Sequence, residues 1–211
     1  APLHSCSILE PSFGSGDFLI QIVERLLTEV REAEGVKPTR ESLCDAVRAV
    51  ELHTPSFKSV KDKIKAMLVE EGIGSVEAEA ILSSWLIQGD FLLTETDLKF
   101  THVLGNPPYI RQELIPNDLL AEYRRRYRTI YDRADIYIPF IERGLQLLVD
   151  GGKLCFICSD RWMKNRYGRP LREKIVSSFS VDAYVDLYGT EPFHNEVSAY
   201  PEIGRASCRE R

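Results

Sequence analysis

The sequence lacks long apolar runs. Hydrophobic residues make up 44% of its 211 positions, yet no stretch approaches the ~18 consecutive apolar residues of a membrane-spanning helix. The N-terminal residues also lack the basic segment and the following apolar segment of a secretory signal. We therefore expect a cytoplasmic protein with no membrane partner, long enough for one α/β domain with a hydrophobic core.

Cysteine is sparse and irregularly placed. The five cysteines are Cys6, Cys44, Cys155, Cys158 and Cys208. Their odd number and their scatter do not fit a disulfide framework. Cys155 and Cys158 have the C-x-x-C spacing of some metal sites, but no second pair accompanies them, and residues three apart on a strand face opposite sides. The four histidines show no ligand spacing, so we expect no metal site.

Basic residues do not outnumber acidic ones. The chain has 27 Lys and Arg against 32 Asp and Glu, a net charge of −5. This total counts mildly against binding of duplex DNA, because DNA-binding proteins carry a basic face. Total charge does not fix where the positive side chains lie, so DNA stays possible as a substrate. The basic run at 124–128 fits either contacts to DNA phosphates or a solvated helix face.

The two ends of the sequence differ from the pattern between them. Residue 1 is not Met, and residues 202–211 break off from the preceding pattern and resemble a translated sequencing-adapter read. We interpret residues 1–201 as the folded domain and residues 202–211 as a non-native tail. The alternative is a natural Arg-rich tail.

Strand and helix patterns alternate along the chain. Strands are expected at 7–9, 46–52, 85–88, 101–104, 153–158 and 181–187, with a turn at Gly151-Gly152. Helices are expected from 17 to about 34 and at 56–71, 76–84, 118–128, 134–149 and 169–179. This alternation predicts an α/β fold with a doubly wound, mostly parallel sheet.

Polar residues stand at the expected carboxyl ends of four strands. They are Glu10, Glu51, Asp90 and Asn106. In doubly wound sheets the loops at these ends hold the ligand. The sequence therefore predicts a small-molecule pocket at this edge.

The loop after the first strand is rich in glycine. It runs from Glu10 through Pro11, Gly14 and Gly16 to Phe18. Glycines let the backbone approach a ligand closely, and the amides at the following helix N-terminus can face a polar group. The G-x-G spacing alone is equally typical of a tight strand-to-helix turn.

Two further acidic residues suit a nucleoside ligand. Glu51 ends the second strand, where a carboxylate commonly takes ribose hydroxyls. Asp90 suits an adenine amino group, and Phe91 suits the adenine ring. The plain alternatives are a solvated carboxylate for Glu51 and a turn-forming aspartate for Asp90.

The segment Asn106-Pro107-Pro108-Tyr109 follows a predicted buried strand and carries the strongest signal. The prolines stiffen the segment and leave carbonyls available as acceptors. The Asn106 side-chain oxygen and the Pro107 carbonyl could each accept one N–H of a planar amino group, and Tyr109 could stack on a base. Such a clamp would aim the lone pair of adenine N6 at a methyl donor, with the base flipped out of the duplex.

These motifs together resemble the adenine-specific methylase domain of Eco57I-type restriction–modification enzymes. The matching segments are EPSFGSGDF from Glu10, DF at Asp90, and LGNPPYIRQE from Leu104. Further segments that look like this family lie at 132–137, 151–157, 159–162 and 195–201, so that the resemblance spans most of residues 7–201.

The resemblance implies a Rossmann-like class I methyltransferase domain, present in part over residues 1–201, with S-adenosyl-L-methionine as cofactor. It implies transfer of a methyl group to N6 of a flipped-out adenine in double-stranded DNA, within a restriction–modification or phage-defence system. The last strands and a target-recognition domain are expected beyond Pro201, and a restriction or specificity domain is a possible partner in the full-length chain. Cofactor binding is implied for Glu10, Pro11, Gly14, Gly16, Phe18, Glu51, Asp90 and Phe91, and catalysis for Asn106, Pro107, Pro108 and Tyr109.

The sequence departs from the family pattern at two places. Asp17 stands where the family often has a small polar residue, and Leu52 to Pro55 replace the usual acidic residue followed by proline. Two other functions stay open. An N5-glutamine protein methyltransferase also uses an Asn-Pro-Pro-Tyr loop on an amide nitrogen, and the chain could be a non-catalytic remnant of a defence complex.

Overall fold

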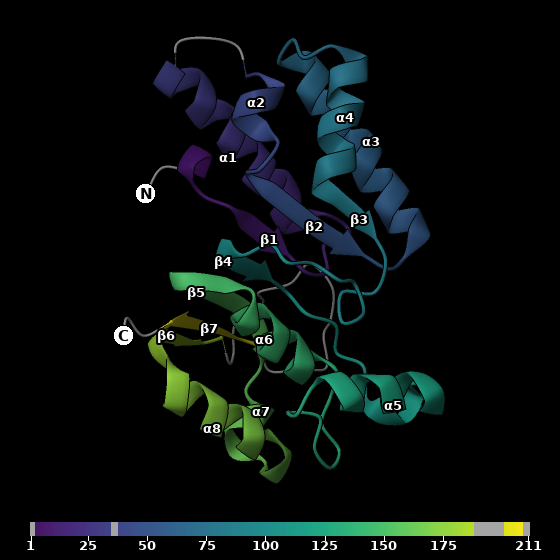
Figure 1. The fold of residues 1–211 in the computed structure, drawn as a ribbon, viewed down its shortest axis with the longest axis vertical. Coiled ribbons are helices and arrows are strands. Elements are labelled where there is room, and N and C mark those ends of the chain that lie inside the picture. The colour runs from purple at the N-terminus through teal and green to yellow at the C-terminus, as the bar shows by residue number, and fades with distance from the viewer. Residues whose placement is uncertain (1–2, 35–37, 188–200, 209–211) are drawn as a thin grey trace. The chain divides into compact units, whose positions relative to one another are not determined.

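In the computed structural model the chain forms two compact units, Ala1–Thr96 and Asp97–Arg211 (Figure 1). The structure describes residues 3–34, 38–187 and 201–208. Both units contain strands and helices, as the α/β prediction requires. None of the helices in the described part of the chain combines the length and the apolarity that crossing a membrane requires.

The first unit has a parallel three-stranded arrangement in which β2 lies between β1 and β3. In register, Ile8 faces Val47 and Ala49 faces Leu86. The elements in chain order are η1 (Leu3–Ser5), β1 (Ile8–Glu10), α1 (Asp17–Glu34), α2 (Arg40–Leu43), β2 (Val47–Glu51), α3 (Thr54–Glu70), α4 (Ser75–Trp85) and β3 (Leu86–Gln88).

Apolar spacing explains these elements. In α1, Leu19, Leu26 and Val30 are almost fully buried and recur at helical spacing, so that they form one buried stripe. In α3 the stripe is Val60, Ile64 and Leu68, one residue per turn, and Pro55 stands in the first turn where its missing N–H costs nothing. Strands β1 and β2 are buried at nearly every position, as expected for parallel strands covered on both faces.

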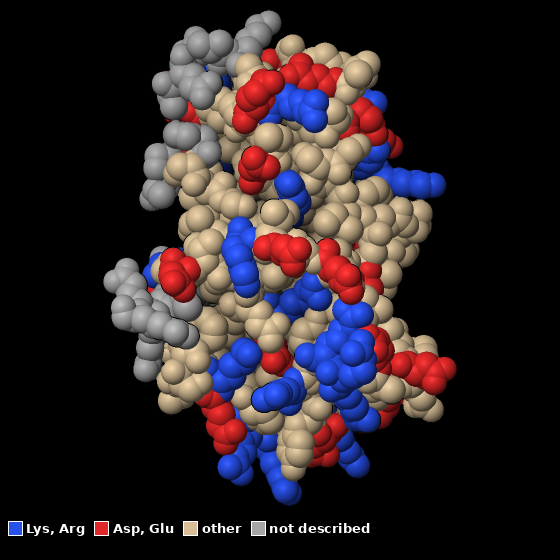
Figure 2. Space-filling view, in the orientation of Figure 1, with Lys and Arg blue, Asp and Glu red and all other residues tan. Residues whose placement is uncertain are grey.

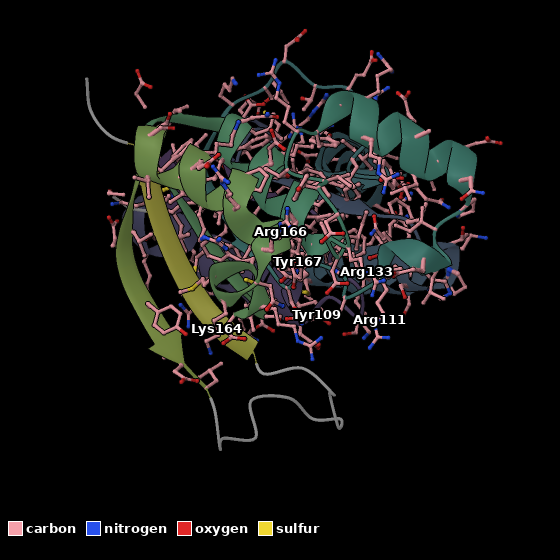
Figure 3. All side chains as sticks on the ribbon, turned by 90° about the horizontal axis from the view of Figure 1, so that it is seen from below. Tyr109, Arg111, Arg133, Lys164, Arg166 and Tyr167 are labelled. Carbon is pink, nitrogen blue, oxygen red and sulfur yellow. The ribbon has the colours of Figure 1, made fainter. Side chains whose placement is uncertain are left out.

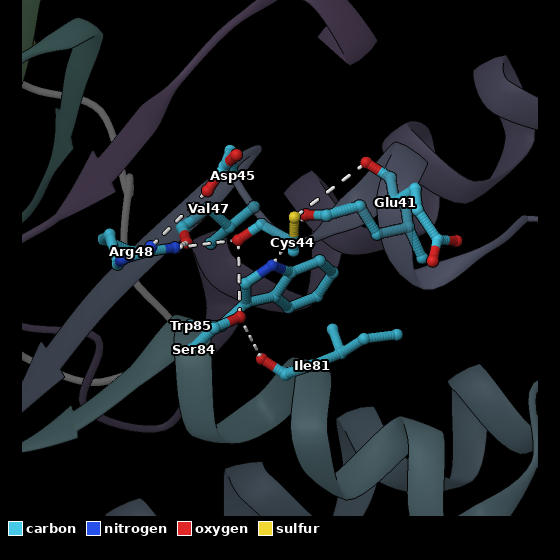
Figure 4. Close-up of polar contacts among 9 residues, drawn as sticks. Glu41, Cys44, Asp45, Val47, Arg48, Ile81, Ser84 and Trp85 are labelled. Atoms are coloured by element: carbon cyan, nitrogen blue, oxygen red, sulfur yellow. Dashed lines mark hydrogen bonds and ion pairs between the residues drawn. The ribbon is translucent and has the colours of Figure 1, made fainter.

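A polar network ties α2, β2 and α4 together (Figure 4). The buried Trp85 indole donates to the Leu43 carbonyl at 2.9 Å, and the Ser84 hydroxyl donates to the Cys44 carbonyl at 3.3 Å. The Arg48 guanidinium also donates to the Cys44 carbonyl, at 2.9 Å. The carbonyls at the end of the short helix α2 are therefore satisfied by side chains from its two neighbours.

The second unit has strands in the order β4-β5-β7-β6. Strands β4 and β5 are parallel, whereas β7 is antiparallel to both β5 and β6. The elements are β4 (Phe100–Gly105), η2 (Gln112–Leu114), α5 (Asn117–Arg126), α6 (Tyr137–Gln146), β5 (Leu148–Ser159), α7 (Arg161–Lys164), η3 (Arg166–Gly168), α8 (Arg169–Ser178), β6 (Phe179–Asp186) and β7 (Pro201–Cys208).

Most predicted elements are present, with shifted ends. Trp85 was expected to begin a strand and instead ends α4. The helix expected from residue 134 begins at Tyr137. The turn expected at Gly151-Gly152 lies inside β5, at a point where the register to β4 shifts and Gly151 has φ 73°.

The tail interpretation for residues 202–211 stays a prediction. The structure places Pro201–Cys208 in strand β7, with Ile203 opposite both Ile157 of β5 and Val185 of β6. Strand pairing uses backbone groups, which any sequence without proline supplies.

Candidate functional site

Glu10, at the carboxyl end of β1, carries an unsatisfied carboxylate oxygen. The residue is 1% exposed, and its Oε2 atom has no hydrogen-bond partner among the described residues. Burial raises the pKa of Glu10 well above its ordinary value, and the charges of Asp17 and Glu51 add to this effect. A buried acceptor without a donor is costly, so the position suits a ligand that brings an N–H group.

The loop that follows Glu10 turns sharply at two glycines. Gly14 has φ 53° and Gly16 has φ 87°, both in the left-handed region that side chains rarely adopt. A Cβ atom on Gly14 would meet nothing within 4 Å, so space is open beside this backbone. A Cβ on Gly16 would lie 2.8 Å from a methyl group of Val60, so Gly16 lets α1 approach α3 closely.

Glu51, at the carboxyl end of β2, holds this loop in place. Its Oε2 accepts a hydrogen bond from the Gly14 amide at 2.7 Å, and its Oε1 accepts one from the His53 amide at 2.6 Å. The Gly89 amide donates to the Glu51 main-chain carbonyl at 3.0 Å. The structure therefore brings the predicted residues Gly14 and Glu51 into direct contact, with the turn at Gly89 beside them.

Asp90 and Phe91 form a turn after β3. The Asp90 Oδ1 atom accepts from the Leu92 amide at 2.8 Å, and the Asp90 carbonyl accepts from the amides of Leu93 and Thr94. This is the turn-forming role that the sequence left open for Asp90. Phe91 is 3% exposed, and a ligand role for either residue stays a prediction.

The remaining cofactor candidates flank the glycines. Pro11 is buried directly after β1, and Phe18 is half-buried in the first turn of α1. Both belong to the same unit as Glu10, Gly14, Gly16, Glu51, Asp90 and Phe91.

The second unit carries the Asn106–Tyr109 loop directly after β4. Pro107 is buried, whereas Asn106, Pro108 and Tyr109 are half-buried. The Asn106 Oδ1 atom is buried and has no hydrogen-bond partner among the described residues. Asn106 therefore presents an acceptor that the described part of the protein leaves unused.

Contacts from β5 and α6 fix the position of Tyr109. Its hydroxyl donates to the Ile157 carbonyl at 3.1 Å, and burial raises the pKa of this phenol. Its ring lies 6.1 Å from that of Tyr137 at an angle of 46°, a tilted aromatic pair. The Ile136 amide donates to the Ile110 carbonyl at 2.9 Å. The loop after β4 is therefore held both by the Tyr109 side chain and by the backbone of the next residue.

Tyr137 and Tyr167 support the loop, and the sequence motifs did not single them out. Their hydroxyls lie 3.3 Å apart, and burial raises the pKa of Tyr137. Tyr137 lies in the segment 132–137, which carried part of the family resemblance and was the available signal. Nothing in the sequence around Tyr167 marks it.

The basic run at 124–128 is largely used inside the second unit. Arg125 and Arg126 both pair with Glu122, at 2.7 and 2.6 Å, and lower the pKa of this half-buried carboxyl to about 2. The Arg124 guanidinium donates to the Gln112 side chain at 2.9 Å. These contacts favour the solvated helix face over contacts to DNA phosphates.

Comparison with known proteins identifies the relatives of the chain. Residues 28–193 match the family model of the Eco57I restriction-modification methylase. The chain is 54% identical over 202 residues to the Type II methyltransferase M.PaeR7I of Pseudomonas aeruginosa, covering 96% of this chain and 35% of the relative. It is 45% identical over 203 residues to M.XhoI of Xanthomonas vasicola, covering 95% of this chain and 37% of the relative. The chain thus spans about a third of the length of these relatives.

Solved structures share the fold at low identity. A nuclease-deletion mutant of the Type ISP restriction-modification enzyme LlaGI, in complex with a DNA substrate mimic, matches 97% of this chain with a TM-score of 0.70 and 16% identity, over 20% of its own length. A class I S-adenosylmethionine-dependent methyltransferase of Listeria monocytogenes, itself named as putative, matches 97% with a TM-score of 0.64 and 14% identity, over 54% of its own length. These likenesses confirm the predicted class I methyltransferase fold.

Proposed function

The chain belongs to the Eco57I restriction-modification methylase family, and from this premise we propose that it is the catalytic part of a DNA methyltransferase that modifies N6 of adenine. The family membership supports a methyltransferase of restriction–modification systems. The choice of adenine N6 rests on one observation, the buried and unpartnered Oδ1 of Asn106 in a loop stiffened by two prolines.

Asn106 and Pro107 act on the amino group of the base. The Asn106 Oδ1 atom and the Pro107 carbonyl each accept one N–H, which turns the nitrogen from planar toward tetrahedral geometry and aims its lone pair out of the ring plane. Because Pro107 and Pro108 restrict the backbone, these acceptors are held before the base arrives, and little reorganisation accompanies reaction. Positioning of this kind supplies several kcal/mol of barrier reduction.

Tyr109 holds the plane of the base. The target must leave the duplex to reach a loop of this kind, which costs a few kcal/mol of stacking and pairing. A tyrosine ring fixed by Ile157 and Tyr137 offers a replacement surface for stacking, typically worth ~1–3 kcal/mol per base.

The first unit fits S-adenosyl-L-methionine. The open space beside Gly14 admits a ligand to the backbone, and the unpartnered Glu10 Oε2 is an acceptor for a ligand ammonium or amide. Glu51 uses one lone pair on each oxygen for Gly14 and His53, which leaves the others for ribose hydroxyls. When bound, this cofactor supplies an electrophilic methyl group on a sulfonium centre.

Asn106→Ala in the intact protein, as its gene encodes it, tests the proposal. Purified wild type and variant are incubated with tritiated cofactor and host DNA, and nucleosides are then analysed by mass spectrometry. We expect N6-methyladenine with wild type and at least a hundredfold lower rate with Asn106→Ala, since a transition-state acceptor is removed. Cofactor affinity measured by calorimetry should be unchanged, because the variant lies in the other unit.

The alternatives give different results. Label in a peptide glutamine and none in DNA would identify a protein methyltransferase. Methylation of adenine that survives Asn106→Ala would remove Asn106 from the mechanism, and absence of methylation in a wild type that binds cofactor would indicate a non-catalytic remnant.

A further inference from the structure

A cavity in the second unit collects three arginines from separate segments of the chain. Its volume is about 200 Å³, and its lining consists of Arg111, Glu113, Arg133, Asp135, Arg161, Asn165 and Tyr167. Arg111 follows the Asn106–Tyr109 loop, Arg133 precedes α6, and Arg161 begins α7. Arg111, Arg133 and Tyr167, which line the cavity, are labelled in Figure 3 together with Tyr109.

These three guanidinium groups differ from the basic side chains around them. Arg125 and Arg169 are each paired with a glutamate at 2.7 Å. In the part of the chain that the structure describes, no side-chain hydrogen bond or ion pair engages Arg111, Arg133 or Arg161. Figure 2 shows many Lys and Arg side chains gathered over the second unit. The cavity is thus a place where positive groups converge without hydrogen-bonded acceptors from the described residues.

The charge of the lining suits a singly charged anion. Three arginines outnumber the two carboxylates of Glu113 and Asp135 by one. The planar guanidinium group donates two parallel hydrogen bonds to a pair of phosphate oxygens, which makes arginine the preferred cation for phosphate groups. A phosphodiester carries one negative charge and two free oxygens, so it matches both the excess charge and the donors.

Two tyrosines connect the cavity to the loop that is proposed to hold the base. Tyr167 lines the cavity and its hydroxyl lies 3.3 Å from that of Tyr137. Tyr137 in turn packs on Tyr109 at 6.1 Å between ring centroids. Arg111 is joined to Tyr109 through Ile110, whose carbonyl accepts the Ile136 amide at 2.9 Å. A nucleotide with its base on Tyr109 would therefore place its own backbone near the arginines.

We propose that this cavity binds a phosphodiester of the DNA strand that carries the target adenine, beside the extruded nucleotide, with Arg111, Arg133 and Arg161 as donors. The inference rests on the proposed function and adds a positioning site to it. Phosphate contacts fix the register of a protein on DNA without reading the bases. The cavity therefore contributes to affinity and to base placement for every target sequence alike.

The test measures DNA binding against salt in the intact protein. The variants are Arg111→Gln, Arg133→Gln and Arg161→Gln, singly and combined, and the probe is a fluorescent duplex containing the methylated site found by sequencing host DNA. Loss of the phosphate contact in the triple variant should reduce the slope of log Kd against log salt by about 0.9, and each single variant should reduce it by less. The matched control is Arg125→Gln, an exposed arginine already paired with Glu122, which should leave the slope unchanged.

A second arm locates the phosphate. A neutral methylphosphonate replaces each phosphate flanking the target adenine in turn. One of these positions should weaken binding by wild type and have little further effect on the triple variant, because that variant no longer has the arginines that this phosphate binds. The arginines lie in the second unit, so an unchanged circular dichroism spectrum and an unchanged urea midpoint of the triple variant show that it is folded.

The outcomes separate the two proposals. If wild type methylates adenine but the triple variant keeps the wild-type slope, or Arg125→Gln lowers the slope equally, the cavity does not bind the phosphodiester and the proposed function stands. The cavity is likewise excluded as the phosphodiester site if every methylphosphonate weakens binding by the triple variant as much as it weakens binding by wild type. If wild type binds cofactor and methylates no DNA, the proposed function fails and the cavity inference fails with it.

Discussion

Replacing Glu10 with glutamine should make the cofactor-free protein more stable. Glu10 is 1% exposed with an unpartnered Oε2, and burial with the neighbouring Asp17 and Glu51 raises its pKa. A raised folded-state pKa costs stability at a pH where the carboxyl ionises, about 1.4 kcal/mol for each tenfold change in proton affinity. An amide of the same shape is neutral and is not repelled by the two carboxylates. We expect the free energy of unfolding at pH 7 to rise by about 1–3 kcal/mol in Glu10→Gln.

The stability difference should depend on pH in a defined direction. Because the folded-state pKa lies above the ordinary value of 4.5, the folded protein binds more protons at Glu10 than the unfolded chain does between these two pKa values. Wild-type stability therefore falls as pH rises through this window and levels off above the folded-state pKa. Glu10→Gln lacks this titration, so its advantage should be small below pH 4.5 and complete above the window.

The assay is urea unfolding over a pH series, with and without cofactor. Loss of a hydrogen bond to a charged acceptor, worth ~1.5–3 kcal/mol, should weaken cofactor binding about 10–100-fold in Glu10→Gln. Glu32→Gln, an exposed position on α1, is the control and should change neither the free energy of unfolding nor the cofactor affinity. A Glu10→Gln protein that is less stable than wild type at pH 7, or that binds cofactor equally well, would refute the reasoning.

Two further substitutions test the geometry. Gly16→Ala would place a Cβ 2.8 Å from a Val60 methyl group at φ 87° and should lower the free energy of unfolding by about 2–4 kcal/mol. Val60→Ala in the same chain should restore part of the lost stability. An unchanged urea midpoint for Gly16→Ala would contradict the predicted clash. Tyr109→Phe loses the 3.1 Å bond to Ile157, about 0.5–1.5 kcal/mol of stability, but keeps the ring, so kcat for DNA methylation should stay within about tenfold. Tyr109→Ala should be roughly 10–100-fold slower still, and equal rates for the two variants would show that the ring has no role.

The fold could be predicted where apolar spacing was unbroken. The stripe Val60, Ile64 and Leu68 gave α3, and the buried run Val47–Glu51 gave β2. The boundary at Trp85 was missed because α4 passes directly into β3 with no glycine or proline between them. Gly151-Gly152 was expected to be a turn, but pairing with neighbouring strands includes it in β5 with a local shift of register.

The site was predictable to the level of strand ends, but its contacts were not. Its position after a strand made Glu51 a candidate, and the structure places it at the end of β2. Its bond to Gly14 joins residues that are 37 apart in the chain and follows only from the tertiary fold. The contiguous basic run at 124–128 suggested contacts to DNA phosphates, although Glu122, one helical turn away, pairs with two of its arginines. Arg111, Arg133 and Arg161 are isolated in the sequence, and only folding brings them to one cavity.

The burial of Trp85 has a practical consequence. The chain has two tryptophans: Trp85 is fully enclosed in the first unit, and Trp162 is half-buried in the second. Each unit thus contains one tryptophan, and the enclosed indole should emit at shorter wavelength than the half-buried one. Single-tryptophan variants would let the unfolding of the two units be followed independently, without attaching any dye.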